Sequence, residues 1–251
     1  LHALAWLRRA PGSALVVAMG RRAEAVVADM SARDVASVMH SYAALGAAPS
    51  PALYGALDRR LLRVAGELDA QDVARLFDAS ARMGRPFAGR AASALERRAE
   101  QIGPSLPVEG LTAVLSAYTA LRQRPGDSLL AVLGRRAEEL APEMNSTNIA
   151  VVINSYAKLW EKVGTSMLTS LSKPVRESDG AAHAGHATAI RFQLMQHMGK
   201  ALLDAVGLRV IRVAPEMSAA SVSNVLEAYA QLREKPDDEV LAALVRRLQL
   251  V

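Results

Sequence analysis

Pairs of adjacent arginines are the residues of this sequence whose type and spacing suggest binding chemistry. A planar guanidinium can donate two parallel hydrogen bonds to a phosphate, so a charge repeated at equal steps is typical of a surface that follows a nucleic-acid backbone. The spacing therefore predicts phosphate contacts with RNA. The alternative is a solvated surface, in which Glu138 and Glu139 pair with nearby arginines. The five pairs, of which the first four keep a step of 38 residues, are Arg21-Arg22, Arg59-Arg60, Arg97-Arg98, Arg135-Arg136 and Arg246-Arg247.

The remaining reactive residue types form no catalytic or metal-binding pattern. His183 and His186 have the i, i+3 spacing of metal ligands, but no third ligand accompanies them, so we expect loop residues and no metal site. Trp6 and Trp160 could stack on a base, although core packing is the better interpretation. We find no Gly-rich phosphate loop, nucleophile–base pair or carboxylate dyad. The sequence thus predicts a protein that is not an enzyme and uses no cofactor or small-molecule substrate.

Composition indicates a helical protein with an acidic partner. Of the 251 residues 51% are hydrophobic but only 4% are aromatic, which favours helix over sheet. The net charge of +5 and the pI near 9.8 favour an acidic partner such as RNA. Zero cysteines exclude disulfides and cysteine zinc sites. Charged residues interrupt every apolar run, so no membrane span is expected.

One amphipathic phrase recurs along the chain, for example as "DVASVMHSYAALG" and as "NIAVVINSYAKLW". The units that contain it start at Met30, Leu68, Leu106, Met144 and Met217. The first three steps are 38 residues each, and a constant step is the mark of a repeat array. The last step is 73 residues, which we interpret as two units shortened by a loop deletion, with a degraded copy between them.

Each unit has two predicted helices. In the first helix the apolar residues follow i, i+3, i+4 spacing and form one stripe. Ser31 with Asp34, and Asp69 with Asp72, have the spacing of helix caps. The second helix is predicted to start at a proline in register, where the missing N–H costs least. The stripe of one unit is Val35, Val38, Met39, Tyr42 and Leu45, and the prolines are Pro11, Pro49, Pro125 and Pro236.

These elements predict an all-α protein, an α-solenoid of about six 38-residue helix-turn-helix repeats over residues 1–251. We expect first helices on the concave side and second helices on the convex side. Because the chain opens at Leu1 within a helical pattern, we also expect a preceding segment that would carry any targeting sequence. The predicted parts are a partial repeat 1–29, repeats from 30, 68, 106 and 144, a degraded repeat at about 182–216, a last repeat from 217, and a flexible insertion at 173–187.

The exposed face of the first helices changes from unit to unit, as a surface that reads different bases would. An equally open interpretation is a solvated face whose polar residues vary freely. Under the first interpretation the RNA-contacting residues of the concave face are Arg33, Ser37, His40, Gln71, Arg75, Asp78, Arg82, Ser116, Thr147, Asn154, Lys158, Asn224 and Gln231.

The 38-residue two-helix unit with its "NSYAKL"-like first helix resembles the octotricopeptide repeat family and the similar heptatricopeptide arrays that accompany RAP domains. The resemblance covers nearly the whole chain. It implies an organellar RNA-binding protein, mitochondrial or alternatively plastid, that contacts rRNA or single-stranded RNA. It also implies neighbouring protein subunits within a ribonucleoprotein such as the mitochondrial ribosome. The alternative is a protein–protein scaffold of a large organellar complex without RNA contact.

Overall fold

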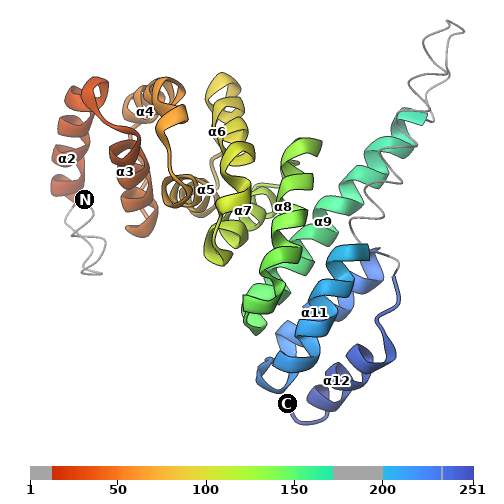
Figure 1. The fold of residues 1–251 in the computed structure, drawn as a ribbon. Helices are drawn as coiled ribbons and strands as arrows, with labels where there is room; N and C mark the ends of the chain where they lie inside the picture. Colours follow the sequence, from red (N-terminus) through yellow and green to blue (C-terminus); the bar gives the residue numbers. More distant parts are fainter. Residues whose placement is uncertain (1–12, 172–199, 233) are drawn as a thin grey trace, which may run out of the picture. The chain divides into compact units, whose positions relative to one another are not determined.

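A computed structural model describes residues 13–171, 200–232 and 234–251, and all regular elements of these residues are helical (Figure 1). This confirms the all-α prediction. No helix in the described ranges is long and apolar enough to cross a membrane. The chain divides into two compact units, Leu1–Leu129 and Leu130–Val251, which are described separately.

The first unit contains two sets of helices that alternate along the chain. We call α3, α5 and α7 the A helices, and α2, α4 and α6 the B helices. A helices contact A helices (α3 with α5, α5 with α7), and B helices contact B helices (α2 with α4, α4 with α6), so each set forms one layer. The bounds are α2 (Ser13–Val26), η1 (Val27–Asp29), α3 (Ala32–Ala44), α4 (Pro51–Val64), η2 (Ala65–Glu67), α5 (Ala70–Met83), α6 (Gly89–Ile102), η3 (Gly103–Ser105) and α7 (Val108–Ala120).

The second unit repeats this order. Its A helices, α9 and α11, contact each other directly. The helix at 200–213 and α12 occupy the B positions, as does α8, in which the boundary between the two units falls. The bounds are α8 (Asp127–Leu140), η4 (Ala141–Glu143), α9 (Ser146–Leu171), η5 (Ala214–Glu216), α11 (Ala219–Leu232) and α12 (Asp238–Leu248).

Most of the apolar stripe of each A helix is buried, as its spacing predicts, although Val38 and Leu45 are half-buried. In α3, Val35 and Met39 are fully buried and Tyr42 is 2% exposed. In α9, Ile153 and Tyr156 are each 1% exposed. Burial of one large apolar side chain contributes about 1.5–3 kcal/mol, so these stripes hold the A layer together.

The helix ends follow from local sequence. Ser31 caps α3 in a complete capping box with Asp34, and the Asp69 side chain accepts a hydrogen bond from the backbone of Asp72. At the other end, Gly46, Gly84 and Arg122 occupy the same position of three units with positive φ. Each donates its N–H to the carbonyl three residues before it, and the next residue bonds five back, which is a Schellman ending.

The register prolines lie outside the helices, contrary to the predicted helix start. Pro49, Pro125 and Pro236 each precede the first residue of α4, α8 and α12 by two positions. A proline there fixes the turn and forces the residue before it into an extended conformation. In α4 the cap is supplied by Ser50, whose side chain accepts a hydrogen bond from the Leu53 N–H. Pro11 lies outside the described residues.

Candidate nucleic-acid interface

In three of the five pairs the second arginine joins the two helices of its own unit. Arg60 Nε donates to the Met30 carbonyl at 2.6 Å, and Arg98 Nε donates to the Leu68 carbonyl at 2.7 Å. Arg247 Nε likewise donates to the Met217 carbonyl at 2.7 Å, and these partners are also 30 residues apart. We call this recurring bond the arginine clamp.

The accepting carbonyl belongs to the residue that starts each unit. This residue follows the 3-10 turn, its backbone is extended, and its own N–H donates back into that turn. The Leu68 and Met217 side chains are fully buried, so their carbonyls have little access to water. A charged donor from the B helix satisfies such a carbonyl and fixes the start of the A helix.

A fourth arginine clamp identifies the A helix with which the helix at 200–213 pairs. Arg209 Nε donates to the Met144 carbonyl at 2.7 Å, so this helix is the B partner of α9. Direct contact between α9 and α11 also makes them consecutive A helices, as α3 and α5 are. The 73-residue step to Met217 contains residues 172–199, which lie outside the described residues. The degraded repeat at about 182–216 therefore stays a prediction, and the predicted insertion at 173–187 lies in the same range.

The first arginine of each pair points to solvent instead. None of the five forms an ion pair within 4.0 Å with a described residue. In the first unit these arginines lie on B helices that contact one another, α2, α4 and α6, and so form a row on one layer. We call the five the arginine row: Arg21, Arg59, Arg97, Arg135 and Arg246.

One unit departs from this division of roles. In the unit of α9 the row position is Leu208, which is 70% exposed, while Arg209 keeps the clamp. The sequence pattern missed Arg209 because no second arginine precedes it. Arg22 is exposed, and Arg136 lies 2.8 Å from Glu139 in an ion pair.

None of the predicted base-reading residues, Arg33, Arg75 and Lys158 among them, is buried. Exposed members are Arg33, Gln71, Arg82, Thr147 and Lys158. Half-buried members are Ser37, His40, Arg75, Asp78, Ser116, Asn154, Asn224 and Gln231.

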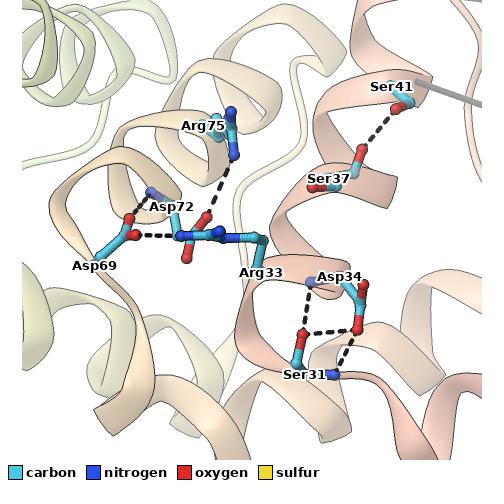
Figure 2. Close-up of polar contacts among 8 residues, drawn as sticks. All are labelled: Ser31, Arg33, Asp34, Ser37, Ser41, Asp69, Asp72 and Arg75. Atoms are coloured by element: carbon cyan, nitrogen blue, oxygen red, sulfur yellow. Dashed lines mark hydrogen bonds and ion pairs between the residues drawn. The ribbon is translucent and has the colours of Figure 1, made fainter. Parts of the chain in front are cut away.

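Two of these arginines form ion pairs with aspartates at the start of α5 (Figure 2). Arg33 on α3 contacts Asp69, the cap of α5, at 3.1 Å. Arg75 lies 3.5 Å from Asp72 on its own helix. Because both pairs involve exposed or half-buried cations, their contribution to stability is small, about 0–1 kcal/mol each. The guanidinium groups therefore remain accessible to a ligand.

Asp78 is the acidic centre of a second group. Asp78 Oδ2 lies 3.0 Å from Arg82 Nε and 3.5 Å from His40 Nδ1, an ion pair when the imidazole is protonated. The His40 imidazole, 3.5 Å away, followed by the hydrogen bond from Arg82, lowers the pKa of the Asp78 carboxyl. The structure thus brings together three predicted site residues from α3 and α5.

Asp78→Asn is expected to reduce the loss of folding stability that occurs as pH falls into the acid range. Because the folded-state pKa lies below the unfolded value, this carboxylate stabilises the fold above the unfolded pKa, and the stabilisation is lost as pH falls through the folded pKa. Melting followed by circular dichroism from pH 7 down to about pH 2 measures the effect. Asp29→Asn, which removes an exposed carboxylate, is the control. If stability decreases with falling pH equally in Asp78→Asn and in the unmodified chain, the expectation is wrong.

Two acceptors of the A-helix face lack hydrogen-bond partners. Asn154 Oδ1 and Gln231 Oε1 are both shielded from water without a donor in reach, although the Gln231 amide nitrogen donates to Glu227 at 3.1 Å. Buried polar atoms are nearly always paired, so these two are candidates for a ligand's N–H groups.

The other candidates are placed only in part. Trp6, His183 and His186 lie outside the described residues, as does the side chain of Trp160. Within the described ranges no group of three or more His, Cys, Asp or Glu side chains could hold a metal ion. No protein-family model matches the chain, and no curated protein matches it.

Proposed function

We propose that this chain is an RNA-binding α-solenoid of 38-residue helix pairs. The arginine row carries the proposal: one exposed arginine without an ion pair recurs at the same place on α2, α4, α6, α8 and α12, although the helix at 200–213 has Leu208 there. The clamp explains why the second arginine of each pair recurs, but it gives no structural reason for the first.

Equal units give equal spacing of charge. Packed helices lie about 8–10 Å apart, so the row arginines of α2, α4 and α6 in the first unit are separated by a distance that a flexible single strand can match with successive phosphates. Phosphate contacts of this kind position a nucleic acid without selecting its sequence. Selection among RNA sequences is assigned to the A-helix face, whose side chains differ from unit to unit. Asn154 and Gln231 provide unpaired acceptors on this face.

The cellular setting of the proposal comes from the family resemblance. On that basis the proposed location is the mitochondrion, with plastids as the alternative, and the proposed RNA is rRNA or an organellar transcript. Neighbouring protein subunits of a ribonucleoprotein, such as the mitochondrial ribosome, are the other partners. The protein has no catalytic role in this proposal.

The salt dependence of binding tests the proposal. Five phosphate contacts with a single strand predict a slope of roughly −3.5 in log K against log salt concentration. Fluorescence anisotropy of a labelled single-stranded RNA, titrated with the protein at several KCl concentrations, measures that slope. Absence of binding, or binding that ignores salt, would reject the RNA proposal.

A protein scaffold is the second candidate function, and Leu208 favours it. This leucine is 70% exposed at a row position, and exposed apolar side chains on a B helix suit a protein partner. Salt-independent capture of a defined protein subunit, lost in Leu208→Lys, would support the scaffold.

A further inference from the structure

An aromatic-lined pocket lies within the first unit, between α5, α6, α7 and the turns that follow α5 and α7. Its volume is about 370 Å³, near the lower end of the range for small-ligand sites. Phe77, Phe87 and Tyr118 line it, and Gln123 and Arg124 add polar groups. The Phe77 and Tyr118 rings are 5.4 Å apart and tilted by 41°, so they present aromatic surface to the space.

Two departures from the repeat open this pocket. Each replaces a large side chain with a small one at a position that lines the pocket. The other repeats keep the large side chains, so the pocket is specific to this repeat. The position of Ser80 holds Tyr42, Tyr118, Tyr156 and Tyr229 in the other units. The position of Ala92 holds Tyr54, Leu130, Leu203 and Leu241.

The Ser80 hydroxyl points to a ligand. Ser80 is 2% exposed, and its Oγ has no hydrogen-bond partner. Other A-helix hydroxyls bond their own helix: Ser41 Oγ donates to the Ser37 carbonyl at 2.6 Å, and Thr119 donates to Leu115 at 2.9 Å. A buried hydroxyl without a partner costs free energy, so a polar group is expected to meet it.

The chemistry of the lining selects the kind of ligand. Aromatic rings stack on a nucleobase, and the Ser80 hydroxyl and Gln123 amide can bond its polar edge. Glu96 and Arg124 add one carboxylate and one guanidinium to the lining, and Arg124 pairs with Asp127. Arg85 stacks on Tyr54 with its guanidinium 3.6 Å from the ring centroid. A phenylalanine from a protein partner would leave Ser80 unsatisfied. We propose that this pocket binds one unpaired nucleobase, an inference that rests on the proposed RNA-binding function.

An RNA octamer that carries one 2-aminopurine tests the proposal. Stacking in the pocket should quench its fluorescence, and 5-iodouridine at the same position should crosslink to Phe77, Phe87 or Tyr118, read by mass spectrometry. Ala92→Leu, which restores the side chain of three other units, should abolish the quenching and weaken binding about tenfold. Ser93→Leu adds the same bulk at an exposed neighbouring position of α6 and should change neither.

Ser80→Ala separates binding from structure. Removal of an unsatisfied hydroxyl should leave the free energy of unfolding unchanged or higher, while quenching decreases. Destabilisation without any effect on quenching would overturn the proposal.

The remaining outcomes separate this pocket from the general function. RNA binding with the expected salt slope but no response to Ala92→Leu would reject the pocket alone, whereas absence of RNA binding would reject both. Binding of N-acetyltryptophanamide that Ala92→Leu abolishes, without any RNA crosslink, would instead assign the pocket to a protein side chain.

Discussion

Arg98→Leu is expected to lower the free energy of unfolding by about 2 kcal/mol, because it removes a charged donor and leaves the Leu68 carbonyl unpaired. The neighbouring Arg97→Leu removes the same charge from the same helix but breaks no bond, and surface changes of that kind stay within about 0.5 kcal/mol. Urea unfolding followed by circular dichroism measures both. Equal losses in the two variants would contradict the clamp.

Arg209→Leu extends this test to the unit that contains α9. If the helix at 200–213 is the B partner of α9, its loss of stability should match that of Arg98→Leu, since the two bonds are both 2.7 Å long. A loss near zero would remove the support for this pairing. Lysine at either position should recover only part of the stability, because an ammonium lacks the fixed Nε–H geometry of arginine.

The period and the apolar stripes were sufficient to predict the helices and which side of each is buried. Local chemistry also predicted the caps at Ser31 and Asp69, because those bonds join residues three apart. Proline predicted the first residue of the second helices less well. Its restricted φ suits a turn as well as a first helical residue, and the structure uses it in the turn.

The roles of the two arginines in a pair could not be separated from sequence alone. The partner of the second arginine is a backbone carbonyl 30 residues earlier, and no side chain marks it. Adjacent residues on a helix point about 100° apart, so one arginine of a pair can reach inward while the other remains in solvent. For the same reason the sequence did not reveal Arg209 as the donor to the Met144 carbonyl.

Replacement of Arg59, Arg97 and Arg135 by glutamine is expected to weaken RNA binding about 100-fold at 0.1 M salt. Each phosphate contact with a single strand contributes about 0.7 to the salt slope, so three lost contacts flatten it by about 2. Extrapolated to 1 M salt, where this contribution vanishes, the variant and the unmodified chain should bind alike. Anisotropy titrations across that salt range measure both values.

The matched control removes the same charge from B-helix positions outside the row. Arg63, Arg90 and Arg212 are exposed, and their replacement by glutamine takes the net charge from +5 to +2, as the row variant does. If only total charge matters, the two triple variants will lose affinity equally, and the row has no special role. If the row follows the phosphates, the control will keep a slope near −3.5, and the loss in the row variant will be the same for every RNA sequence, because backbone contacts do not distinguish bases.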